Sequence, residues 1–247
     1  MKKILVILSI MLFLAGSASA DLINPGRPVT PGDTGTALQG VFNDIAVGTA
    51  INAISDQSAV AVWRPQASGG SVNTFIFTDI GSSTDSMGLY SYADHSKQLQ
   101  VFQGNASAGV QQVVSFLGNG SVQLLGQPST NIPGFGSTFG FYFDTANGTF
   151  YTEDSLNSGT PYALSYAGDG SKTIQIGLLG SGPFAVNEWI IAFDGYANGP
   201  GDTTTFTDAV FLAESIQPAV PEPATLLLLG SGLLGMGVLA RRRFIKK

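Results

Sequence analysis

The sequence contains no cysteine and a single histidine, His95. Without cysteine the chain forms neither a disulfide framework nor a lipoprotein anchor. One histidine cannot supply the nitrogen and sulfur ligands of the usual zinc sites. A Ser-His-Asp triad would have to use His95, and the sequence has no Gly-x-Ser-x-Gly motif. Because residues 92–97 are polar, we interpret His95 as a solvated turn residue and expect no enzymatic activity.

Basic residues are scarce between the two ends of the chain. Residues 21–219 hold only Arg27, Arg64, Lys97 and Lys172 against 16 acidic residues, a net charge near −12. This charge argues against nucleic acid and anionic lipid as partners, because phosphate binding needs clustered lysine and arginine. The acidic surface is compatible with divalent cations, and equally with a role in solubility alone.

The first 20 residues have the composition of a secretory signal peptide. Lys2 and Lys3 precede the apolar run 4–14, and small residues ending in Ala18-Ser19-Ala20 follow. This order of charge, apolar run and small residues predicts export by the Sec route with cleavage after Ala20.

The last 28 residues combine an extended motif, an apolar run and a basic end. Residues 217–223 form a proline-rich linker, 224–240 carry no charge, and 241–247 contain the cluster Arg241, Arg242 and Arg243. Alternating prolines keep the peptide around Glu222 extended. The 17 uncharged residues are at the short limit for a transmembrane helix, and adjacent positive charge favours a cytoplasmic tail.

This layout resembles the PEP-CTERM sorting signal of Gram-negative bacteria. The motif residues are Val220, Pro221, Glu222, Pro223, Ala224 and Thr225, with Arg241, Arg242 and Arg243 at the end. The resemblance implies transient recognition by an exosortase, a membrane-embedded cysteine transpeptidase. It also implies an intermediate anchored in the inner membrane through 224–240, then delivery to the envelope surface or the exopolysaccharide matrix. The alternative is an ordinary C-terminal anchor without processing.

The body between the two ends has a mainly β pattern. Three prolines and three glycines make 21–35 a flexible lead-in. An i, i+3, i+4, i+7 apolar stripe predicts an amphipathic helix over about 36–46. Short β runs separated by turn residues follow. We expect strands at 58–64, 72–80, 87–92, 98–103, 110–117, 121–125, 138–144, 148–153, 162–166, 172–179, 188–194 and 205–213. The spacing favours a single β-sandwich domain, jelly-roll-like, over 36–216.

One hairpin is specified in detail by the sequence. Phe139, Phe141 and Phe143 alternate with other residues, as a strand with one buried face requires. Asn147-Gly148 then separates this run from 149–152, and this dipeptide suits the positive φ angles of a tight turn.

Three aspartates near the end of the body form the candidate metal site. Asp194 ends an apolar run, Asp202 lies in a glycine-rich loop, and Asp208 begins the next run. Calcium takes six to eight oxygen ligands, to which a loop adds backbone carbonyls. We therefore predict Ca²⁺ as the cofactor that Asp194, Asp202 and Asp208 would hold, in a loop that is not an EF-hand. The alternative is that these residues only shape turns.

The same stretch resembles an Asp-rich domain of unknown function found in many PEP-CTERM surface proteins. The resemblance covers about 138–214 and rests on the segments 139–142, 155–157 and 203–211. It implies calcium binding. The chain departs from the pattern at Thr203, Thr205 and Thr207, where acidic or amide ligands are usual.

These observations favour an exported surface or matrix protein with a structural or adhesive role and no catalysis. The alternative is a calcium-dependent carbohydrate-binding module that contacts exopolysaccharide or envelope glycans through tyrosines on strands. A third hypothesis is a carboxylate-based glycoside hydrolase or lyase, for which Glu153, Asp154 and Glu188 are the candidates.

Overall fold

The computed structural model describes residues 22–32, 35–66, 71–78, 85–104, 106, 109–177, 179–195 and 205–219, with the backbone alone for 71–78. Residues Ile23–Ala219 form one compact unit. The predicted signal peptide (1–20), transmembrane helix (224–240) and basic tail (241–247) lie outside the described residues. Within the described residues, no helix has the length and apolarity that a membrane span requires.

Two antiparallel sheets make up most of the body, which confirms the mainly β prediction. The larger sheet has the strand order β1 (Gln57–Ser58), β11 (Ala163–Ala167), β14 (Trp189–Phe193), β15 (Ala209–Glu214), β3 (Ser71–Thr78), β6 (Gln111–Phe116), β7 (Val122–Leu124) and β8 (Gln127–Ile132). The second has the order β16 (Ile216–Pro218), β2 (Trp63–Pro65), β9 (Phe139–Thr145), β4 (Ser86–Ser91) and β5 (Gln98–Gln103), and β10 (Gly148–Tyr151) also pairs with β9. A small hairpin pairs β12 (Thr173–Ile174) with β13 (Gly182–Pro183).

The two sheets enclose the main core with their facing side chains. Trp63 of β2 packs edge-to-face on Trp189 of β14, with ring centroids 5.5 Å apart. Phe141 of β9 packs on Phe211 of β15 in the same way, at 5.0 Å. Edge-to-face contacts add to the stabilisation from apolar burial because of the ring quadrupoles.

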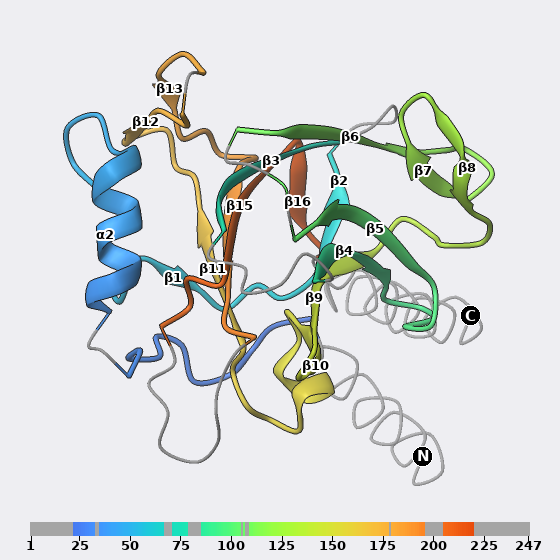
Figure 1. Cartoon of the computed structure of the whole chain (residues 1–247), viewed down its shortest axis with the longest axis horizontal. Coiled ribbons are helices and arrows are strands. Elements are labelled where there is room, and N and C mark those ends of the chain that lie inside the picture. The colour runs from blue at the N-terminus through green and yellow to red at the C-terminus, as the bar shows by residue number, and fades with distance from the viewer. Residues whose placement is uncertain are drawn as a thin grey trace, which may run out of the picture. The chain divides into compact units, whose positions relative to one another are not determined.

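The strands β14 and β15 are buried on both faces, which explains their continuous apolar sequences. Trp189, Ile191 and Phe193 point into the core between the sheets. Ile190 and Ala192 point to the other face, into a second core that includes side chains of α2 (Thr36–Ile45). Figure 1 shows α2 on one side of β11 and β15, with β2, β4 and β9 on the other. The central strands therefore form a middle layer.

The helix predicted over 36–46 is confirmed as α2. Its buried stripe consists of Leu38, Phe42 and Ile45, and Phe42 packs edge-to-face on Tyr166 of β11 at 4.8 Å. Gly35, with φ +79°, begins the helix, a conformation that suits glycine because it has no Cβ.

The hairpin predicted around Asn147-Gly148 is also confirmed. Thr145 of β9 pairs with Gly148 of β10, which leaves Ala146 and Asn147 as the turn. The Asn147 backbone amide donates to Thr145 Oγ1 at 3.0 Å, and Gly148 has φ +134°. The turn residues therefore set the register of both strands.

The described part of the segment 21–35 differs from the flexible lead-in that its turns predicted. Arg27 donates two hydrogen bonds of 2.9 Å to the Asp154 carboxylate. Asn24 Nδ2 donates to the Thr152 carbonyl at 2.7 Å, and Asn24 Oδ1 accepts from the Asp154 amide at 2.9 Å. These long-range contacts fix the segment on the body, which the local sequence does not reveal.

The strand β8 was missed by the sequence analysis. Its residues read Gln-Pro-Ser-Thr-Asn-Ile, with a proline and no apolar alternation. The strand lies at the edge of the larger sheet and pairs with β7. An edge strand tolerates proline and needs no buried face, so the usual strand pattern is absent from it.

Candidate functional site: a carboxylate cleft, buried acids and the sorting motif

Two glutamates from opposite ends of neighbouring strands line one cleft. Glu188 immediately precedes β14, Glu214 ends β15, and the pairing of Trp189 with Ala213 brings these two strand ends together. The cleft measures about 230 Å³ and is lined by Gln111, Ile174, Ile176, Leu179, Gly180, Gly182, Pro183, Glu188, Leu212 and Glu214. The hairpin β12–β13 thus supplies apolar walls to a pair of acids.

The two acids of this carboxylate cleft have different surroundings. Burial, followed by the nearby charge of Glu188, raises the pKa of the Glu214 carboxyl. Glu188 Oε2 instead accepts a hydrogen bond from the Ala185 backbone amide at 2.8 Å. Two carboxyl groups in different surroundings within one cleft are suited to proton transfer. The pair also suits a cationic group.

The buried acids Glu153 and Asp154 lie elsewhere, next to and within a short 3-10 helix, η1 (Asp154–Asn157). Glu153 Oε1 accepts a 2.6 Å hydrogen bond from the Tyr90 hydroxyl of β4. Burial, followed by the charge of Glu153, raises the pKa of Tyr90 well above its ordinary value. Tyr90 therefore stays protonated and acts as a hydrogen-bond donor. A Cβ at Gly140 would lie 2.3 Å from this hydroxyl, so glycine is needed beneath it.

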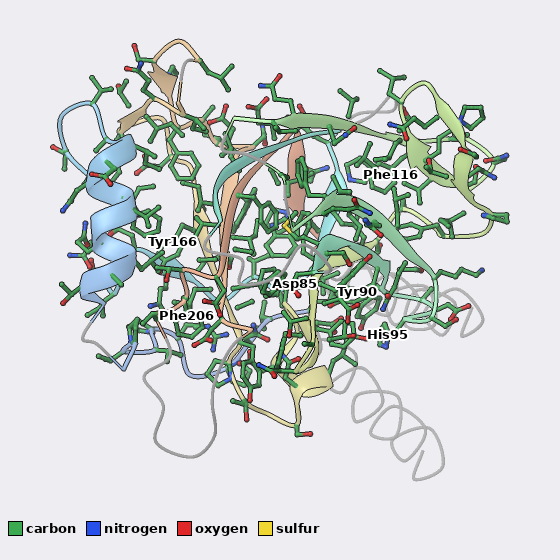
Figure 2. All side chains as sticks on the ribbon, in the orientation of Figure 1. Asp85, Tyr90, His95, Phe116, Tyr166 and Phe206 are labelled. Atoms are coloured by element: carbon green, nitrogen blue, oxygen red, sulfur yellow. The ribbon has the colours of Figure 1, made fainter. Side chains whose placement is uncertain are left out.

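His95 lies beside the same buried carboxylate. Its Nε2 atom is 3.9 Å from Glu153 Oε1, and its ring meets that of Tyr90 edge-to-face at 5.5 Å. Figure 2 shows His95 next to Tyr90, at the end of β4. Sequence analysis predicted a solvated turn here. The turn is present, since the Lys97 amide donates to the Asp94 carbonyl at 2.9 Å, but Nε2 is buried.

Asp154 forms a buried ion pair that joins two distant parts of the chain. Arg27 Nη1 lies 2.9 Å from Asp154 Oδ2, and the two side chains are 4% and 10% exposed. Arg27 also donates to the Ala163 carbonyl at 3.1 Å. Glu153 and Asp154 were candidates for a glycosidase pair with Glu188. The structure places them in contacts that hold the fold, whereas Glu188 faces Glu214, which the sequence analysis did not select.

Asp194 and Asp208 flank the two ends of the predicted calcium loop, while Asp202 lies outside the described residues. Asp208 Oδ2 accepts a hydrogen bond from the Gly195 amide at 2.7 Å, and the Asp208 amide donates to the Phe193 carbonyl at 3.1 Å. Asp194 is buried, and its amide donates to the Tyr162 carbonyl at 3.0 Å. Within the described residues no group of three potential metal ligands occurs. The calcium site stays a prediction.

Phe206 anchors the far end of this loop. Its side chain is fully buried in the core beneath α2, and Figure 2 shows it on the side of the body that carries Tyr166 and α2. Its φ is +56°, a left-handed conformation that costs on the order of 1–3 kcal/mol for a residue with a bulky side chain. Burial of the ring offsets this cost and fixes where the loop rejoins β15.

The tyrosines considered for sugar stacking are largely internal. Tyr90, Tyr142 and Tyr166 are buried, and Tyr166 donates its hydroxyl hydrogen to the Ala53 carbonyl at 2.7 Å. Tyr92, Tyr151 and Tyr162 are half-buried. The three buried rings are therefore not available to form a flat aromatic face for a sugar.

Comparison with known protein families identifies the end of the chain. Residues 219–243 match the PEP-CTERM protein-sorting motif. The chain carries a PEP-CTERM sorting signal. The matched range includes all nine residues predicted for it, from Val220 to Arg243. This PEP-CTERM motif implies a secreted protein that is processed at the membrane by an exosortase and reaches the cell surface.

The remaining comparisons bear on the body of this PEP-CTERM protein. No curated protein and no solved structure matches the chain. The resemblance of 138–214 to an Asp-rich domain therefore stays a prediction, as do the Sec route and the membrane anchor.

Proposed function

We propose that the mature body is a structural or adhesive component of the cell surface or the exopolysaccharide matrix, without catalysis. The sorting motif at residues 219–243 is the observation that carries this proposal. It directs the chain to the surface, where residues 21–219 remain after both ends are removed. Two sheets that face each other across one core support the β-sandwich, jelly-roll-like architecture included in the proposal.

The acidic groups of the body support a structural role. Arg27 and Asp154 tie the start of the body to η1, and Tyr90 holds Glu153. Asp208 closes the base of the loop that begins at Gly195. Each carboxylate thus stabilises a connection between segments distant in sequence, as an extracellular protein without disulfides requires.

The proposal is tested by separating the sorting motif from the body. Deleting residues 220–247, or replacing Pro221, Glu222 and Pro223 with alanine, should reduce the amount of protein on cells and in the isolated matrix at least several-fold. The matched control replaces Pro25, Pro28 and Pro31 with alanine, which changes as many residues at the other end of the body. Unchanged surface and matrix retention of the motif variants would refute exosortase sorting.

Adhesion is tested with purified residues 21–219. Binding to polysaccharide isolated from the same cells is expected without turnover of that polysaccharide. A glycan array with and without a chelator distinguishes the alternative, a calcium-dependent carbohydrate-binding module built around Asp194, Asp202 and Asp208. Binding that disappears on chelation favours that module, and binding that survives favours adhesion through another surface.

The carboxylate cleft favours a second candidate function, a glycoside hydrolase or lyase. The supporting observation is the raised pKa of Glu214 next to Glu188 within one cleft. The volume of about 230 Å³ is below the range of about 300–1,000 Å³ for most ligand sites, so only the end of a glycan would enter. Turnover that is lost in both Glu188→Gln and Glu214→Gln, but kept in Asp169→Asn, would replace the structural proposal with this one.

A further inference from the structure

Charge is distributed very unevenly along the body. Residues 98–143 contain no Asp, Glu, Lys, Arg or His, although the body as a whole has a net charge near −12. We call these 46 residues the neutral block. It includes β5, β6, β7 and β8 and most of β9. Figure 1 shows the β7–β8 hairpin at the opposite end of the body from α2.

The neutral block contains an edge strand, β8. Gln127, Pro128, Ser129 and Asn131 of this strand are exposed, and the sheet order leaves β7 as its neighbour on one side only among the described residues. Natural proteins usually protect such edges with charged side chains, because an open edge pairs with other chains. The edge of β8 has no charge, and its flanks expose Leu125, which is 62% accessible.

The register shows which backbone groups of β8 point outward. The Leu117 amide donates to the Ser121 carbonyl and the Leu125 amide to the Val113 carbonyl, so Ser121 and Leu125 direct their hydrogen-bonding groups to β6. By alternation, Val122 directs its groups to β8, where it pairs with Ile132. Ile132 therefore faces β7, whereas the amide and carbonyl of Asn131 point away from the sheet.

Pro128 and a register shift between Val122 and Leu124 interrupt the first half of this edge. Thr130 Oγ1 replaces a backbone acceptor there, since it accepts from the Leu124 amide at 2.9 Å. Asn131, in the second half, keeps both its backbone donor and its backbone acceptor. The geometry thus allows a short antiparallel pairing rather than a long one.

Electrostatics determine which partner fits this edge. Two copies of a body with a net charge near −12 repel each other over most of their surfaces. At physiological ionic strength the repulsion falls off over about 8 Å, so it is weakest where the facing surfaces carry no charge. The neutral block is such a surface except at its margin, where Lys97 Nζ donates to the Gly134 carbonyl at 2.8 Å. An unpaired strand edge is complementary to itself about a two-fold axis.

We propose that mature chains associate in pairs through antiparallel contact between the second halves of their β8 strands. Asn131 of each copy donates and accepts the added backbone hydrogen bonds, and exposed apolar side chains beside the edge are covered. At a cell surface, where the sorting motif concentrates the protein, even a weak contact of this kind joins neighbouring molecules. This inference concerns the body alone and is independent of the sorting route.

The test is the oligomeric state of residues 21–219 in sedimentation equilibrium at several protein and salt concentrations. Association is expected to strengthen from low to high salt, because salt screens the repulsion between acidic bodies. The double variant Ser129→Lys with Asn131→Lys should weaken association at least about tenfold, or ~1.4 kcal/mol, since it places like charges opposite each other at the two-fold axis.

The matched control is Ser155→Lys with Thr160→Lys, at two exposed positions outside the neutral block. It changes the net charge by the same amount, so it should preserve or strengthen association. A monomer at every salt and protein concentration, or equal association of both variants, would overturn the proposal. Hydrogen exchange of the unaltered protein gives a second measurement. The Asn131 amide should become protected as concentration rises, and unchanged exchange would also contradict the pairing.

Discussion

The neutral block and the rest of the body are stabilised by different interactions. Outside the block, buried and partly buried charges connect distant segments, as Arg27 does with Asp154 and Lys172 with Asp56. Inside it, apolar packing dominates, with Phe116 stacked on Phe139 at a centroid distance of 4.9 Å. Charged contacts in this protein therefore lie where a single interaction attaches a loop or the N-terminal segment to the body. The neutral block relies on the continuous core.

Removing one partner of the buried ion pair should give the largest effect. Arg27→Met leaves the Asp154 carboxylate buried without its cation and should lower the free energy of unfolding by about 3–5 kcal/mol. Urea unfolding of the mature body measures this loss. Arg64→Met, at an exposed position of β2, is the control and should change stability by less than about 0.5 kcal/mol. A cost of Arg27→Met as small as that of the control would contradict the structural role of the ion pair.

A core truncation in the neutral block should cost nearly as much without any dependence on charge. Phe139→Ala removes a fully buried ring and should lower the free energy of unfolding by about 3–5 kcal/mol. The loss should be the same at pH 5 and pH 8, because the ring packs on Phe116 and Phe141. Leu125→Ala, at an exposed side chain, is the control. A loss that differs between the two pH values would weaken the contrast between the regions.

Alkaline pH should destabilise the neutral block through the ionisation of one residue, Tyr142. Tyr142 is its only titratable side chain, and burial, followed by the charge of Asp144, raises the Tyr142 pKa from 10.0 to about 12. A raised folded-state pKa gives stability that is present below pH 10 and lost as pH rises toward 12. At 1.36 kcal/mol per pKa unit the total loss is about 3 kcal/mol.

Unfolding at pH 8 to 12 measures this alkaline loss. Tyr90 and Tyr166, whose pKa values are also raised by burial, contribute outside the block in the same direction. Tyr142→Phe should remove the part of the alkaline stability loss that comes from Tyr142 and leave the part that comes from Tyr90 and Tyr166. An alkaline profile unchanged by Tyr142→Phe would show that this hydroxyl is solvated in the folded protein.

The smallest effect is expected at the carboxylate cleft. The raised pKa of Glu214 means that its charged form is disfavoured on folding, so its contribution to stability is lost as pH rises. Glu214→Gln should therefore raise the free energy of unfolding at pH 7, by less than about 1 kcal/mol, because water screens this half-exposed group. The gain should vanish at pH 4. A decrease at pH 7 would show that the Glu214 charge is paired in the folded state.

Helix α2 and the β9–β10 hairpin could be predicted because the sequence patterns that specify them lie within a few neighbouring residues. The stripe of Leu38, Phe42 and Ile45 predicted α2, and the Phe139–Phe143 alternation with Asn147-Gly148 predicted the β9–β10 hairpin. Edge strand β8 was missed since it has no buried face and contains Pro128. The contacts of Arg27 were missed because they join residues more than 120 positions apart.

The candidate site was only partly predictable for the same reason. Glu188 was selected as an acid in the sequence, but nothing near it in sequence points to Glu214. The antiparallel pairing of Trp189 with Ala213 places the two acids at one end of the sheet. Conversely, Glu153 looked available for catalysis, yet the fold buries it against Tyr90 from a distant strand.

By itself the sequence determined that this protein is sorted to the cell surface. A sorting signal is recognised as a linear peptide with a fixed order of motif, apolar run and basic end. The sequence also determined the β character of the body, since strand periodicity and turn residues act over a few positions. Only the tertiary structure decided which acids are buried, which two share a cleft, and that the neutral block contains an open strand edge. Those properties depend on strand order and register, which arise from contacts between residues far apart in the chain.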